Sequence, residues 1–251
     1  MDATGPTLLR RALAVLQAKQ YLVFYAIPLY ALSALVPLVL SWQRAGGSVD
    51  ETVERAQAPL YDVAAAPGAT AIVVLLVYLG VFTWFRAGYI RSIVSRFRLR
   101  PQDGRQFASL LGLHLLIELA TAAGAWVIVG SGDATAVTLT GIVVFLFSIV
   151  VMYADYAIVI TGLDPVRAIA RSWVCVGANL GLSAFVVLVV NLLATAAGTL
   201  LALSVTDGLM QAAPLLVVYV VVMGVVTFVA DVVLVVAYTH AVETGRLPHA
   251  R

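Results

Sequence analysis

The chain is poor in cysteine and in charged residues. Among its 251 residues only Cys175 is a cysteine, and only 11% are Asp, Glu, Lys or Arg. A lone cysteine cannot form an internal disulfide and has no second thiol for a metal, so a disulfide scaffold and a thiolate zinc site are excluded. So few charges leave little for a water-facing surface, which argues against a soluble protein.

Motifs of the common enzyme classes are also missing. The sequence has no Gly-x-Ser-x-Gly elbow, no glycine-rich phosphate loop with lysine and no repeated acidic motif suited to lipid-headgroup transfer. His114 and Glu118 have the i, i+4 spacing of two metal ligands, but the second acid-histidine cluster of a metalloprotease or two-metal site is absent. We therefore predict a protein that is not an enzyme and has no metal or cofactor.

Long apolar stretches take the place of those motifs, and 62% of the residues are hydrophobic. Each stretch reaches or approaches the ~20 residues that a helix needs to cross a bilayer. The sequence predicts an all-α, polytopic bundle that forms a single integral membrane domain over residues 1–251. The six predicted spans are residues 21–41, 69–85, 107–129, 134–160, 180–205 and 212–239.

The basic residues lie almost entirely in connections on the same side of the predicted membrane. If the N-terminus is cytoplasmic, 13 of the 15 basic residues are cytoplasmic, and only Arg44 and Arg55 lie outside. This bias predicts that both termini lie in the cytoplasm and that the protein resides in the cytoplasmic membrane. The net charge of +2 reflects arginines near lipid, so it does not indicate a nucleic-acid partner.

Two cytoplasmic segments have the pattern of amphipathic helices that lie in the membrane interface. In the first, Phe85–Arg100, apolar residues recur at helical spacing while Arg91, Arg96 and Arg98 point elsewhere. In the second, from Asp164 to Gly177, Asp164 is suited to cap a helix that begins at Pro165. There we expect Arg167 and Arg171 to lie apart from an apolar face formed by Val166, Ile169, Ala170 and Trp173.

The arginines of these two segments have two interpretations. In the first, Arg91, Arg96, Arg98, Arg167 and Arg171 recognise anionic lipid headgroups. In the second, they only anchor the topology near phosphate groups.

The second segment belongs to a run that resembles a known family. The run extends from Tyr153 to Trp173, with Gly162 and Asp164-Pro165 ahead of Arg171-Ser172-Trp173, and Gly177-Ala178-Asn179-Leu180 follows it. It resembles the signature of a six-helix prokaryotic membrane family, similar to the membrane domain attached to some glycerophosphodiester phosphodiesterases and to stand-alone proteins of unassigned activity. The resemblance implies the fold and a membrane location. It does not imply phosphodiesterase activity, because the barrel with metal-binding acids is not in this sequence.

Polar residues inside the predicted spans are the remaining candidates for a site. Counting ~1.5 Å per residue places Glu118 and Asn191 near the midplane, and His114, Asp155 and Asp231 in the inner third. We expect the face of His114 and Glu118 to turn inward, because a lipid-exposed carboxylate costs at least ~2.5 kcal/mol. The predicted intramembrane polar cluster comprises Arg86, His114, Glu118, Asp155, Asn191 and Asp231.

This cluster also has two interpretations. It either forms a cytoplasm-facing cavity for an ion, a proton or a small solute, or it fixes the helix order through hydrogen bonds and ion pairs. Arg86 is the expected partner of Asp155 or Asp231. We expect a structural role for Asp231 and a functional one for Glu118, which no basic residue readily reaches.

Two functions follow from these patterns. The first is a membrane scaffold or accessory protein that contacts anionic lipid or partner proteins through its basic helices. The alternative is a small transporter or channel that uses the polar cluster. The sequence leaves open a membrane-protein partner or a homo-oligomer. An open cavity around the cluster would favour transport, and pairwise neutralisation in a dry interior would favour a structural role.

Overall fold

The structure is a computed structural model that describes residues 4–44, 69–95, 103–131, 134–205, 209–245 and 247. Within these ranges the regular structure is helical throughout. The elements in chain order are α1 (Thr4–Ala18), η1 (Gln20–Leu22), α2 (Val23–Arg44), α5 (Ala69–Val94), α6 (Gly104–Ser131), α7 (Ala134–Val151), α8 (Ala154–Thr161), α9 (Pro165–Ala178), α10 (Leu180–Val205) and α11 (Leu209–Glu243).

Several of these helices are long and apolar enough to cross a membrane. Within the described ranges four pass this test alone: Ile72–Val94, Gly104–Gly124, Thr138–Thr161 and Pro214–Glu243. The number rises to six if each of two bent pairs is one span, Thr7–Ala18 with Gln20–Ser33 at 72° and Pro165–Ala178 with Leu180–Leu193 at 101°. The described part of the chain is therefore an all-helical bundle with four to six helices that could span a membrane.

The predicted spans agree with the helices to different degrees. α10 coincides with the predicted span 180–205, and α6 and α11 extend the predicted spans by a few residues at each end. The predicted span 134–160 is divided between α7 and α8 at Met152 and Tyr153.

The prediction of a separate interfacial helix over Phe85–Arg100 is wrong for its first part. α5 continues without a break through Val94, and Ile90 and Ile93 are 0% and 3% exposed in the core. These side chains are buried against protein, so they are not free to lie on a lipid surface. Arg86 does not end the membrane helix, because its charge is neutralised inside the bundle. Arg96 and Arg98 lie outside the described residues.

The second amphipathic segment begins as predicted. Gly162, with φ of +71°, ends α8 in the left-handed region that favours glycine, and the side chain of Asp164 then caps α9 by accepting a hydrogen bond from the Arg167 N–H at 3.0 Å. The Ser172 hydroxyl accepts from the Tyr153 N–H at 2.9 Å, which ties α9 back to the start of α8. This bond explains why a serine occupies the buried side of α9.

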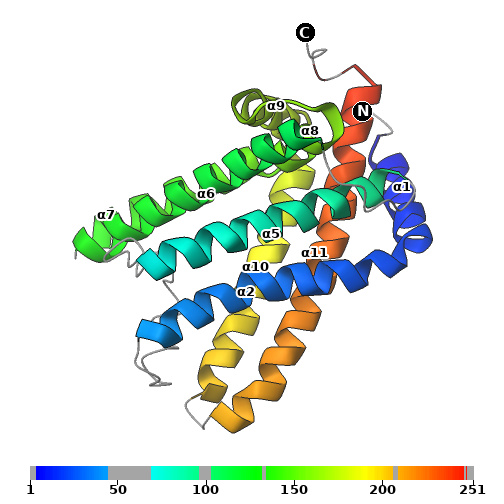
Figure 1. Cartoon of the computed structure of the whole chain (residues 1–251). Helices are drawn as coiled ribbons and strands as arrows, with labels where there is room; N and C mark the ends of the chain where they lie inside the picture. Colours follow the sequence, from blue (N-terminus) through cyan, green and yellow to red (C-terminus); the bar gives the residue numbers. More distant parts are fainter. Residues whose placement is uncertain are drawn as a thin grey trace.

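α1 is a helix that the sequence analysis does not predict. It contacts α11, and Arg11 Nη1 lies 2.9 Å from Glu243 Oε2 across that contact. Ala12 of α1 is buried, while Leu9 and Leu13 are exposed. Figure 1 shows α1, α9 and the C-terminal part of α11 at the same end of the bundle.

α8 is a short helix beside α9 near one end of the bundle (Figure 1), and it positions the polar cluster. It contacts α5, α6, α9 and α11, and the largest fully buried side chains include Tyr153, Tyr156 and Tyr238. Because α8 touches all four helices, a polar side chain on it can reach partners from several spans at once.

Candidate functional site

The site is built around Arg86, which lies on α5 inside the bundle. Its guanidinium makes two hydrogen bonds to Asp231 on α11, from Nη1 to Oδ2 at 2.6 Å and from Nη2 to Oδ1 at 2.8 Å. Asp231 is only 4% exposed. This two-point contact matches the planar fork of arginine to both oxygens of one carboxylate, which is the strongest geometry for such a pair.

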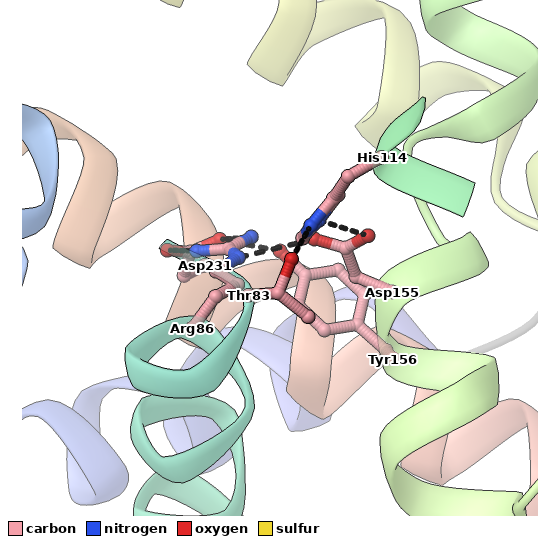
Figure 2. A network of polar contacts seen from close by, with 6 residues as sticks. All are labelled: Thr83, Arg86, His114, Asp155, Tyr156 and Asp231. Atoms are coloured by element: carbon pink, nitrogen blue, oxygen red, sulfur yellow. Dashed lines mark hydrogen bonds and ion pairs between the residues drawn. The ribbon is translucent and has the colours of Figure 1, made fainter. Parts of the chain in front are cut away.

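Asp155 on α8 extends the network to a third and a fourth helix. Its Oδ2 accepts from Arg86 Nε at 3.1 Å, and its Oδ1 lies 3.4 Å from Nε2 of His114 on α6. The other ring nitrogen of His114 lies 2.8 Å from the hydroxyl oxygen of Thr83 on α5. Figure 2 shows this continuous series of contacts from Thr83 to Asp231.

Aromatic side chains enclose the Arg86 guanidinium. The Tyr156 hydroxyl donates to Asp231 Oδ1 at 2.5 Å, and the Arg86 Cζ lies 5.8 Å from the centre of the Tyr156 ring. The Tyr89 ring centre is 5.7 Å from the same atom. Both distances fall within the range of cation–π attraction, so the arginine is stabilised by rings as well as by carboxylates.

A cavity of about 470 Å³ opens beside this network. Arg86, His114 and Asp155 form part of its wall, and Glu118 forms another part. The remaining wall is largely aromatic and aliphatic, with Tyr30, Ser33, Tyr78, Phe82, Ile117, Met152 and Thr227 among its residues. Asp231 does not line the cavity, because it lies behind Arg86 on the buried side of the network.

Glu118 differs from the other carboxylates of the cluster. Its side chain is half-buried and faces the cavity one helical turn from His114. Within the part of the chain that the structure describes, no donor makes a hydrogen bond or an ion pair to its carboxylate. His114 and Tyr78 interact with it electrostatically. Arg86, the only arginine or lysine among the described residues that line the cavity, is already bound by two aspartates.

The prediction that Asn191 belongs to this cluster is wrong. Its side-chain amide donates to the Val187 carbonyl of its own helix at 2.8 Å, and the residue is exposed on the outside of α10. Counting residues along the helices places Asn191 and Glu118 at the same depth in the bilayer. The Asn191 side chain, however, points away from the cluster. Depth alone does not tell on which side of a helix a residue lies.

Three residues of the network were not predicted. Thr83 lies one turn before Arg86 on α5, a spacing that points to a shared face. Tyr89 lies one turn after Arg86 on the same helix, so its spacing also points to a shared face. Tyr156 has no such signal, because only the packing of α8 against α5 brings it to Arg86.

The arginines predicted to contact lipid have partners of their own. Arg91 donates to the Gln106 side chain, and Arg167 Nε lies 3.3 Å from Asp164 Oδ2 at an exposed position on α9. Arg171 is half-buried. Of these three, only Arg167 presents its guanidinium mainly to the surroundings.

The described residues contain no group of three or more His, Cys, Asp or Glu side chains that could hold a metal ion. No protein-family model, curated protein or solved structure matches this chain.

Proposed function

We propose that this chain is a six-span protein of the cytoplasmic membrane that binds a small solute in the polar cavity and passes it through the bundle, as a transporter or channel. In this proposal the spans are α2, α5, α6, α7 with α8, α10 and α11, and both termini are cytoplasmic. α1 and α9 bend away from α2 and α10 and lie along the interface. The arginine bias supports the orientation. The resemblance to the six-helix family remains a prediction that agrees with this topology.

The observation that carries the proposal is the unpaired Glu118 at the cavity wall. An ionised carboxylate inside a membrane is energetically costly. A carboxylate with a purely structural role is therefore paired with a cation, as Asp231 is with Arg86 at 2.6 Å. Glu118 has no such partner among the described residues and instead faces about 470 Å³ of free space. Pockets for small molecules have volumes of ~300–1,000 Å³, so this cavity is large enough for a solute.

The ion-pair network has a complementary role in this proposal. Arg86, Asp155 and Asp231 connect α5, α8 and α11, so they hold the walls of the cavity at a fixed distance. His114 contacts Asp155 and so connects α6, the helix that carries Glu118, to these three helices. The network therefore supports the shape of the site, and Glu118 is the group left to act on a ligand.

The scaffold function is a second candidate, supported by α9. Val166 and Trp173 are 75% and 61% exposed on this helix, beside the exposed Arg167. Apolar and cationic side chains on one outer surface suit a helix that rests on anionic lipid. Neither candidate is enzymatic. Retention of anionic lipid by Arg167 variants tests this second candidate.

Water accessibility of the cavity tests the proposed transport function. Cysteines placed at Glu118 and Ser33, which line the cavity, should react with a water-soluble methanethiosulfonate in membranes. A cysteine at Leu119 is the matched control, because that side chain is on the same helix and 67% exposed toward the predicted lipid phase. The native Cys175 is buried, so the unmodified protein supplies the background. Equal protection of all three positions would show that the cavity is closed to water, and the proposal would then fail.

A further inference from the structure

The charges around the cavity do not balance. Among the described residues that line it, Arg86 is the only arginine or lysine. Three carboxyl groups lie in the wall or directly behind it, those of Glu118, Asp155 and Asp231. With all three carboxyl groups ionised, a net negative charge remains even if His114 is protonated. Unbalanced charge is costly in a membrane interior, and a bound cation relieves that cost where a bound anion adds to it.

The wall near Glu118 is aromatic. Tyr78 and Phe82 lie one turn apart on α5 with ring centres 5.7 Å apart, and Phe82 lies 5.2 Å from the His114 ring. Across the cavity, the Tyr30 hydroxyl donates to Tyr219 at 2.8 Å, which satisfies its polar end and fixes the ring. Aromatic faces attract cations, most strongly where water is excluded.

This wall suits an organic cation better than a metal ion. A hard metal cation requires about six oxygen ligands, and the described residues offer no cluster that could hold one. A substituted ammonium ion has a weakly hydrated, apolar surface that rings and aliphatic side chains can contact directly. Glu118 then supplies the single counter-charge that such a ligand needs.

We infer that the ligand of this cavity is a small organic ammonium ion, held by the Glu118 carboxylate and by the aromatic wall of Tyr30, Tyr78 and Phe82. This inference rests on the proposed function, because it names the class of solute for the same site. The cavity of about 470 Å³ accommodates a compact ammonium ion and excludes long or branched polycations.

The binding test compares three probes of similar size and different charge. Choline is the cation, dimethylbutanol is its uncharged isostere in which carbon replaces the ammonium nitrogen, and propanesulfonate is the anion. Isothermal titration of the full-length protein in detergent should show choline binding, with the other two at least ~10-fold weaker, which corresponds to ~1.4 kcal/mol.

Variants then assign the binding to named groups. Glu118→Gln should weaken choline binding by about 10-fold or more, because the amide keeps the size and removes the counter-charge. Tyr78→Leu should weaken it several-fold, and Tyr78→Phe, which keeps the ring, should restore most of the affinity. Asn191→Leu is the matched control, since Asn191 is an intramembrane polar residue outside the cavity. Melting temperatures identify any variant that has lost its fold.

The outcomes separate the inference from the proposed function. Equal affinity for choline and dimethylbutanol, or no detectable choline binding at millimolar concentration, overturns the inference. If Glu118 and Ser33 cysteines still react with aqueous reagents, the cavity remains a solute site for another chemical class. If they do not react, the proposed function fails as well.

Discussion

The Asp231→Asn substitution removes the charge that faces Arg86 and keeps the size of the side chain. In the structure both Asp231 oxygens accept from Arg86, at 2.6 and 2.8 Å, and the carboxylate is almost fully buried. Removing one partner of a buried ion pair costs ~3–5 kcal/mol, because the other charge is left poorly compensated. Asp155 remains 3.1 Å from Arg86 Nε, so we expect the lower end of this range, ~3 kcal/mol.

The double variant separates the pair from the rest of the packing. Arg86→Gln combined with Asp231→Asn leaves no uncompensated arginine, so it should recover part of the loss caused by Asp231→Asn alone. Interhelical hydrogen bonds in membrane proteins average ~0.6 kcal/mol in such cycles. For a two-point, charge-assisted contact we expect a coupling free energy of at least ~1.5 kcal/mol.

Unfolding in mixed micelles with increasing SDS, followed by circular dichroism, gives the free energy of unfolding for each member of the cycle. Glu118→Gln is the control, because its carboxylate has no partner among the described residues, and it should change stability by less than ~1 kcal/mol. A coupling free energy below ~0.5 kcal/mol would refute the reasoning, as would a loss for Glu118→Gln as large as that for Asp231→Asn.

Two further predictions concern helix packing and lipid contact. Gly224→Ala should destabilise the protein by ~1–3 kcal/mol, because a Cβ there would lie 2.7 Å from the Ile27 Cα, whereas Gly80→Ala, with nothing within 4 Å, should be neutral or mildly stabilising in the same unfolding assay. Arg167→Gln should lower the retention of phosphatidylglycerol, measured by native mass spectrometry at low salt, by about fivefold, since one cation near an anionic surface contributes ~1 kcal/mol. Unchanged phosphatidylglycerol retention would contradict lipid contact by α9, and phosphatidylcholine retention serves as the control.

Hydropathy and local signals predicted much of the fold. The limits of α10 follow from one uninterrupted apolar stretch, because the length needed to cross hydrocarbon is set by the bilayer. The start of α9 follows from Asp164 and Pro165, whose capping and fixed φ are local properties. Both features depend on residues close in sequence, so they can be read without knowledge of the packing.

Features that depend on tertiary contacts were not predicted. Arg86 looks like the end of a span in the sequence, yet α5 continues past it because Asp155 and Asp231 come from other helices to neutralise it. α1 was missed because it is too short and too polar for a span.

Some residues of the site could likewise be predicted from the sequence, and others depend on tertiary contacts. The pairing of Arg86 with acids was expected from charge alone, since an isolated cation inside a bilayer is costly. Asn191 was grouped with Glu118 by depth, but its side chain bonds to its own helix, because residue depth leaves the direction around the helix axis undetermined. Thr83 and Tyr156 join the network only through the packing of α5, α6, α8 and α11.

The central claim is that a water-filled, negatively charged cavity around Glu118 lies inside the bundle. Its most direct test uses the Ser33→Cys variant with two methanethiosulfonates, one carrying a trimethylammonium group and the other a sulfonate. Relative to a free thiol, the cationic reagent should react at least ~10-fold faster than the anionic one, and Glu118→Gln should reduce this preference, because clefts of one charge concentrate the opposite ion. Equal rates for both reagents, or a preference unaffected by Glu118→Gln, would contradict the claim.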